Sequence, residues 1–205
     1  MSAGCWALVP VKARADCKCR LAEQLTAEAR LGLVRLMLNR VLTELSASAC
    51  VERIAVVSPE RDTLADDIAV LADAGGGLNA ALDAARLQLM AQGAKELVVL
   101  PADLPFVTAA DIDALVHQGR RGGFALASDL AGTGTNALYL APPAPFRFQF
   151  GLGSRLRHLA EAVRLGRHPE LVRAAGLEFD LDVADDVARL AARGDAGYRS
   201  LAIAP

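Results

Sequence analysis

The 205-residue sequence lacks any apolar run near the roughly 20 residues that a membrane-spanning helix needs. Its first residues lack the charged region and long apolar core of a secretion signal, so we expect a cytoplasmic protein. The formal net charge is only −2. No global electrostatic field therefore attracts nucleic acid or a membrane surface, and binding to either is not expected.

Metal-binding and disulfide patterns are also scarce. The chain has four cysteines and three histidines, and the pair Cys17 and Cys19 has no partner pair. A zinc site and a disulfide framework are therefore not expected, which agrees with a reducing compartment. The loop after the first predicted strand has neither the Walker A glycines nor a G-x-G-x-x-G pattern. An ordinary dinucleotide-binding site is thus disfavoured.

What the chain does contain is an ample core, with 53% hydrophobic residues, and alternating strand and helix patterns. Short apolar runs predict strands at residues 5–11, 54–57, 68–71, 97–100, 124–127, 137–140 and 177–181, with a half-buried strand at 146–150. Helical patterns predict helices after Thr26, after Gly77, and near residues 109–118, 155–165 and 184–193. This alternation predicts one α/β domain over residues 1–205, with a mostly parallel mixed sheet sandwiched by helices.

The most informative segment is residues 101–105, Pro-Ala-Asp-Leu-Pro, directly after a strand-like run. The prolines should end the strand and hold Asp103 at its carboxyl end, where open α/β sheets bind ligands. Such a carboxylate suits a divalent metal held against phosphate oxygens. The alternative is that Asp103 only caps the helix that begins near residue 109.

Four further segments carry groups suited to an anionic ligand. They are the basic loop with Lys12, Arg14, Lys18 and Arg20, the glycine turn 75–77, the Gly-Thr loop 132–136, and the helix start 151–154 followed by His158. Asp180 and Asp182 share one face and repel each other unless a cation lies near them. Plain interpretations also stand for several of these groups: a solvated basic loop, a flexible glycine turn, a structural His158, or helix capping by Asp182.

Taken in order, several segments resemble one family. They are residues 9–12, 18–21, 77–82, 101–105, 132–138, 150–154 with His158, and 177–186. The sequence is similar to the 2-phospho-L-lactate guanylyltransferase (CofC-like) family of coenzyme F-420 biosynthesis over nearly its whole length. It departs from the family at Leu152, where proline is usual, and at Cys19, where serine is usual.

The resemblance implies a nucleotide-diphospho-sugar-transferase-like, Rossmann-like fold. It also implies GTP as donor, pyrophosphate as product, and a small phospho-acid as acceptor: 2-phospho-L-lactate, 3-phospho-D-glycerate or phosphoenolpyruvate. As protein partners it suggests a second copy of the chain and a downstream transferase of the same pathway. Two other interpretations compete with it: a molybdopterin-type nucleotidyltransferase and a non-catalytic nucleotide-sensing domain.

On this basis we expect four sets of site residues. The catalytic set is Lys12, Lys18, Arg20 and Asp103. The nucleotide set is Pro10, Lys12, Gly77, Leu78, Asn79, Pro101 and Ala102. The acceptor set is Thr135, Asn136, Gly151, Ser154 and His158. The Mg²⁺ set is Asp103 and Asp182, with Asp180 as a helper.

Overall fold

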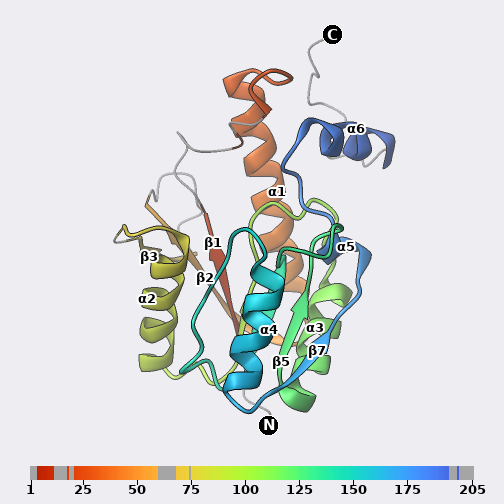
Figure 1. Ribbon diagram of the computed structural model, residues 1–205. Coiled ribbons are helices and arrows are strands. Elements are labelled where there is room, and N and C mark those ends of the chain that lie inside the picture. The colour runs from red at the N-terminus through yellow and green to blue at the C-terminus, as the bar shows by residue number, and fades with distance from the viewer. Residues whose placement is uncertain are drawn as a thin grey trace.

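The computed structural model describes residues 4–11, 18, 21–59, 68–73, 75–193 and 198 (Figure 1). In this part of the chain the strands form one sheet: β1 (Cys5–Pro10), β2 (Val51–Ser58), β3 (Ala69–Ala72), β4 (Leu97–Val99), β5 (Gly123–Ala127), β6 (Ala137–Leu140) and β7 (His168–Leu171). The helices are α1 (Ala27–Ala47), α2 (Leu78–Ala91), α3 (Ala109–Gly122), α4 (Ser154–Arg164), α5 (Ala175–Glu178) and α6 (Ala184–Arg193).

The strand order in the sheet is β3-β2-β1-β4-β6-β5-β7. Neighbouring strands are parallel except that β6 runs antiparallel to both β4 and β5. The predicted mostly parallel mixed sheet is therefore confirmed. The order of the strands reverses between β1 and β4, and open α/β sheets bind ligands at such a switch point.

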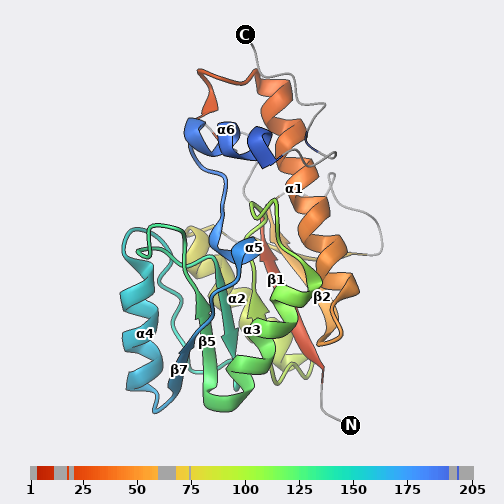
Figure 2. The ribbon, with the colours of Figure 1, turned by 90° about the vertical axis from the view of Figure 1, so that its right-hand side faces the viewer.

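Helices cover both faces of the sheet (Figure 2). On one face, Leu38 and Val41 of α1 share a core cluster with Ile112 and Val116 of α3. On the other face, α2 and α4 pack through a second cluster that contains Leu82. Each fully buried aliphatic side chain contributes about 1.5–3 kcal/mol relative to exposure. The sheet is therefore held firmly from both sides.

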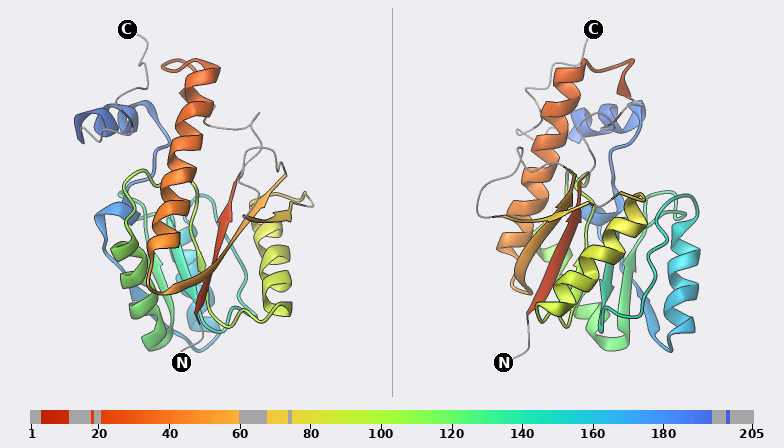
Figure 3. Two further views of the ribbon diagram at one scale, coloured as in Figure 1. Left: turned by 180° about the vertical axis from the view of Figure 1, so that it is seen from behind. Right: turned by 90° about the vertical axis from the view of Figure 1, so that its left-hand side faces the viewer.

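Helix α1 begins with Thr26, whose side chain accepts a hydrogen bond from the Ala29 N–H at 3.1 Å. Its first half projects beyond the carboxyl edge of the sheet, where α6 lies beside it (Figure 3). Leu33 and Met37 of α1 share a third core cluster with Val187 and Leu190 of α6. This cluster supports the segment that leads from the sheet into α6. None of the helices in the described residues is long and apolar enough to cross a membrane.

Two of the predicted strands are wrong. Residues 177–181 form no strand: α5 occupies the first part, and the last strand of the sheet is β7 instead. Strand β7 escaped prediction because it is only partly buried and contains Pro169, which a strand tolerates at the edge of a sheet. Residues 146–150 form no strand either. Phe146 and Phe148 are buried in the cluster between α4 and the sheet, and Phe150 is partly buried against the same cluster.

Helix α3 runs on to Gly122, although it was predicted to end at Gly119. A Cβ atom at position 119 would collide with the ring of Tyr139. Gly119 is thus required by close packing of the helix on the sheet. The residue with left-handed backbone that ends the helix is Gly123, at φ 76°.

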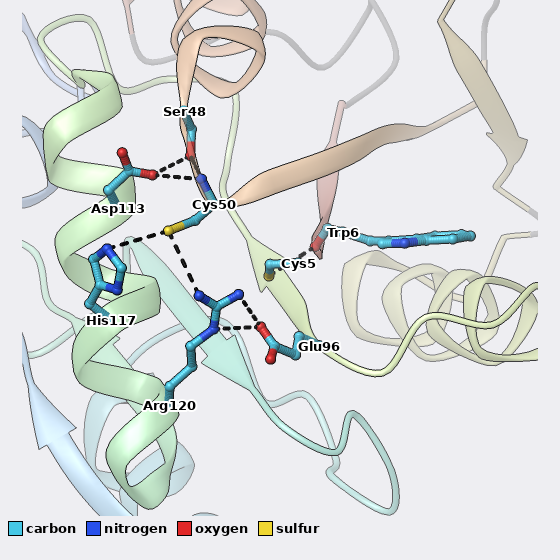
Figure 4. A network of polar contacts seen from close by, with 8 residues as sticks. All are labelled: Cys5, Trp6, Ser48, Cys50, Glu96, Asp113, His117 and Arg120. Carbon is cyan, nitrogen blue, oxygen red and sulfur yellow. Dashed lines mark hydrogen bonds and ion pairs between the residues drawn. The ribbon is translucent and has the colours of Figure 1, made fainter. Parts of the chain in front are cut away.

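A polar network joins α1, β2 and α3 at the amino edge of the sheet (Figure 4). The Asp113 carboxylate accepts hydrogen bonds from Ser48 Oγ at 2.5 Å and from the backbone N–H of Cys50 at 3.1 Å. Arg120 of the same helix pairs with Glu96 at 2.8 Å. These contacts lie at the edge opposite the predicted site, so they support the fold and not the chemistry.

Candidate active site

Asp103 lies just beyond the carboxyl end of β4, as predicted. The Leu100 N–H donates to the Leu8 carbonyl at 3.1 Å, which continues the pairing with β1 until Pro101 interrupts it. Leu104 is completely buried, while the Asp103 side chain keeps 28% of its surface exposed. The core thus anchors the turn and leaves the carboxylate at the sheet edge.

Asp103 does not cap α3. The cap of that helix is Thr108, which forms a reciprocal capping box with Asp111. The Thr108 side chain accepts from the Asp111 N–H at 3.2 Å, and the Asp111 carboxylate accepts from the Thr108 N–H at 3.0 Å. The carboxylate of Asp103 is therefore available for another role.

Backbone contacts bring Asp182 to the same place. The Leu181 N–H donates to the Asp103 carbonyl at 3.2 Å, although 78 positions separate the two residues in the numbering. Asp186 Oδ2 then accepts from the backbone N–H groups of Asp182 and Val183 at 3.0 and 2.9 Å. It is thus the Asp186 side chain that satisfies these amides at the start of α6, which leaves the Asp182 carboxylate directed elsewhere.

Lys18 joins the two carboxylates. Its ammonium nitrogen lies 2.8 Å from Asp103 Oδ2 and 2.8 Å from Asp182 Oδ1, and only 10% of its side chain is exposed. Burial alone would lower the pKa of Lys18, but the charges and hydrogen bonds of both carboxylates outweigh it and raise the pKa above its usual value. The two predicted metal ligands therefore already share one cation.

Asp180 lies near this pair but has its own partner. Its Oδ1 accepts a hydrogen bond from Asn136 Nδ2 at 3.2 Å. Burial, then the charge of Asp103, raises the pKa of Asp180 to about 6, while the Asn136 hydrogen bond opposes the shift. In the part of the chain that the structure describes, no group of three His, Cys, Asp or Glu side chains is close enough to hold a metal. Asp103 and Asp182 thus meet on the Lys18 ammonium, whereas Asp180 is held by Asn136.

The Gly-Thr loop between β5 and β6 is folded around Asp129, which is not among the predicted site residues. Its Oδ1 accepts from the N–H groups of Thr133 and Gly134 at 2.8 and 2.9 Å. Arg155 at the start of α4 donates to the Gly132 carbonyl at 2.9 Å. An Asp followed by a glycine-rich turn was the signal that could have predicted this loop closure.

This loop closure brings together two predicted acceptor residues from different elements. Ser154 Oγ donates to Thr135 Oγ1 at 3.2 Å. Gly151, with φ 117°, lies just before α4, and Asn136 begins the run into β6. His158, the remaining predicted acceptor residue, is completely buried, and both of its ring nitrogens have partners inside the protein. The His158 ring thus lies beneath the hydroxyl groups of Thr135 and Ser154 and contacts Thr135.

The predicted nucleotide residues lie at the ends of three elements. Pro10 ends β1, Pro101 and Ala102 follow β4, and Gly77 and Leu78 begin α2. Lys12, Arg14 and Arg20 of the basic loop, together with Cys17 and Cys19, lie outside the described residues.

Asn79 has an additional structural contact. Its Oδ1 accepts from the Phe150 N–H at 2.7 Å, and its Nδ2 donates to the Phe150 carbonyl at 3.2 Å. This pair of hydrogen bonds ties the start of α2 to the segment that leads into Gly151. Hydrogen bonds therefore join the predicted nucleotide-binding region to the predicted acceptor-binding region.

A protein-family model described as "Guanylyl transferase CofC like" matches residues 5–200. The chain belongs to this CofC-like guanylyl transferase family. It is 41% identical over 199 residues to a protein named phosphoenolpyruvate guanylyltransferase from Rubrobacter xylanophilus, covering 95% of this chain and 97% of the relative. A protein of the same name from Sphaerobacter thermophilus is 38% identical, with 95% and 96% covered. The chain is thus a nucleotidyltransferase, and the family resemblance found in the sequence is confirmed.

Solved structures agree on the fold. A nucleotide-diphospho-sugar transferase from Desulfovibrio desulfuricans superposes with a TM-score of 0.78 at 16% identity, covering 98% of this chain and 91% of that one. A nucleotidyl transferase from Methanothermobacter superposes with a TM-score of 0.63 at 15% identity, with 93% and 97% covered. These similarities confirm the Rossmann-like nucleotide-diphospho-sugar-transferase fold.

Proposed function

We propose that this guanylyltransferase joins GMP from GTP to phosphoenolpyruvate and releases pyrophosphate. The names of its relatives support this acceptor. The observation that carries the proposal is the meeting of Asp103 and Asp182 on one ammonium group, at the switch point of the sheet. Ligands of open α/β sheets bind at that point.

The donor set fits Mg²⁺. In nucleotide sites this ion is commonly held by one or two carboxylates together with phosphate oxygens. Asp103 and Asp182 provide two carboxylates, and both already pair with the ammonium group of Lys18, which supports a site for positive charge between them. When bound there, Mg²⁺ would neutralise charge on the triphosphate. We propose Asp103 and Asp182 as its ligands.

The reaction needs positioning and charge neutralisation more than proton transfer. A phosphate monoester has a second pKa near 6, so the acceptor's phosphate is largely a dianion at pH 7 and attacks the α-phosphorus without a general base. In-line attack breaks the bond from the α-phosphorus to the bridging oxygen, and pyrophosphate leaves with that oxygen. The Lys18 ammonium, which pairs with Asp103, would also neutralise charge on the triphosphate. Thr135 and Ser154 would offer hydroxyls to the acceptor.

Three acids carry the required phosphate and carboxylate: phosphoenolpyruvate, 3-phospho-D-glycerate and 2-phospho-L-lactate. We place phosphoenolpyruvate first because the relatives carry that name. A second copy of the chain, a downstream transferase and a cytoplasmic location stay predictions.

The test is pyrophosphate release from GTP with each acid in turn, with the nucleotidyl product identified by mass. We expect release with GTP and phosphoenolpyruvate, and none when the acid or the nucleotide is omitted. Replacing GTP by CTP is the matched control for the base. Absence of release with phosphoenolpyruvate, or release from CTP in place of GTP, would contradict the proposal.

A further inference from the structure

The buried ring of His158 lies directly beneath the Thr135–Ser154 hydroxyl pair. Its Nδ1 is 3.0 Å from Thr135 Oγ1, and its Nε2 is 2.9 Å from the backbone nitrogen of Gln149. The ring makes an edge contact with Phe150, with centroids 4.8 Å apart. It is completely buried, so it cannot turn to other partners without local rearrangement.

The backbone fixes the tautomer of this ring. The Gln149 N–H can only donate, so Nε2 must accept and carries no proton. In a neutral imidazole the proton then lies on Nδ1, which donates to Thr135 Oγ1. Burial, and then the charge of Arg157, lower the pKa of His158 to about 4, while Glu161 opposes the shift. The ring is therefore neutral near pH 7.

The tautomer decides how many hydroxyl hydrogens remain for a ligand. Thr135 and Ser154 have one hydroxyl hydrogen each, and the contact between them uses one. When Nδ1 donates to Thr135, the Thr135 hydroxyl hydrogen is not needed for the ring. One hydroxyl hydrogen of the pair therefore remains for a ligand. With Nδ1 as acceptor, Thr135 would give its hydrogen to the ring, Ser154 would give its own to Thr135, and none would remain. The first state donates to an anion, whereas the second offers it only lone pairs.

We propose that His158 is a positioning residue that holds the Thr135–Ser154 pair in the donor state needed to bind the anionic end, phosphate or carboxylate, of the acceptor. The inference rests on the proposed function, since it takes this hydroxyl pair as part of the acceptor site. His158 itself does not contact the acceptor. It acts through its hydrogen bond to Thr135, while the Gln149 N–H donates to Nε2 on the other side of the ring and fixes the tautomer.

Two substitutions separate the two sides of the ring. In His158→Asn the side-chain amide lies near the place of Nδ1 and can still donate to Thr135, but the Gln149 N–H loses its acceptor. In His158→Gln the carbonyl oxygen can still accept from Gln149, but nothing donates to Thr135, so its hydroxyl hydrogen is no longer held in the direction that leaves it for the acceptor. We expect His158→Gln to raise the acceptor KM about tenfold or more above that of His158→Asn, the effect of weakening one hydrogen bond to a charged group. The KM for GTP should be the same in both.

A double-mutant cycle tests whether His158 affects the acceptor KM through the Thr135 hydroxyl. In a Thr135→Val background, exchanging His158 for glutamine should change the acceptor KM little further, because the hydroxyl through which it acts is gone. Equal acceptor KM values for His158→Asn and His158→Gln, whether high or low, would overturn the proposal.

The tautomer itself is measurable in the wild-type protein without any substrate. Nitrogen-15 NMR of the histidine rings at pH 7 should show a protonated Nδ1 and an unprotonated Nε2 for His158. The opposite tautomer would overturn the inference even if the substituted proteins failed to fold. Because this measurement needs no turnover, its failure is distinguishable from a failure of the guanylyl transfer assay, which tests the proposed function.

Discussion

The ammonium nitrogen of Lys18 lies 2.8 Å from the carboxylate of Asp103, and it touches Asp182 at the same distance. Three side chains from distant parts of the sequence thus form one ionic cluster at the carboxyl edge of the sheet, in which the lysine is buried and the two carboxylates stay partly exposed. Breaking such a cluster by removing its cation leaves two facing carboxylates without compensation. Its chemistry is therefore sensitive to what occupies the space between them.

The first prediction is that Lys18 and a divalent metal compete for this carboxylate pair in the nucleotide-free protein. Lys18→Met removes the competing charge, so Mn²⁺ should bind about tenfold or more tightly to this variant than to the wild type. Calorimetry or the electron paramagnetic resonance of free Mn²⁺ measures this without turnover. Lys95→Met makes the same charge change at an exposed position and is expected to leave the Mn²⁺ affinity unchanged. Equal affinities for wild type and Lys18→Met would rule out competition.

The second prediction concerns the pH dependence of stability. The pKa of His158 is about 4 in the folded protein, whereas an unperturbed histidine has about 6.5. The unfolded chain therefore binds the proton more readily, so the stability contributed by the neutral ring is complete above pH 6.5 and is lost as the pH falls through about 4. Between these values the wild type should lose up to about 3 kcal/mol more than His158→Asn.

Urea unfolding at several pH values between 7 and 4 measures this difference. The two proteins share every other titrating group, including Glu161, so subtracting their profiles isolates the imidazole. Parallel profiles over the whole range would show that the ring titrates normally.

The third prediction is that Asp113 contributes to the stability of the fold but not to guanylyl transfer. Asp113→Ala removes the acceptor for Ser48 Oγ and for the backbone N–H groups of Ala49 and Cys50, at the edge of the sheet opposite the site. Loss of this acceptor should lower the free energy of unfolding by about 1–3 kcal/mol. Guanylyl transfer well below the unfolding temperature should be unchanged. Glu52→Ala, at a carboxylate that is 52% exposed, should change stability by less than about 0.5 kcal/mol. A large loss of activity in folded Asp113→Ala would contradict this division.

The sequence predicted the parts of the site that follow from local rules. Pro101 and Pro105 around Asp103 end a buried strand, and glycines mark the turns before α2 and α4. These features depend on neighbours along the chain, and the structure places them at the expected ends of strands and helices. The buried run before Asp103 was also sufficient to place it at the sheet edge.

Other parts depend on contacts that a single sequence does not contain. The Leu181–Asp103 hydrogen bond, which places Asp182 in the site, joins distant segments. Strand β7 has too little burial and too many polar residues to stand out by pattern. The orientation of His158 depends on the backbone N–H of Gln149. Such a contact cannot be predicted from residue type, because every residue except proline has a backbone N–H.

The most direct test of the central claim is the rate of pyrophosphate release by Asp103→Asn with GTP, phosphoenolpyruvate and Mg²⁺. If Asp103 and Asp182 hold the metal–triphosphate unit, this nearly isosteric change should lower turnover at least about a hundredfold, the scale of losing a central charge-stabilising group. Far-ultraviolet circular dichroism and the urea midpoint should confirm that the fold is intact. A folded Asp103→Asn protein with wild-type turnover would contradict the account.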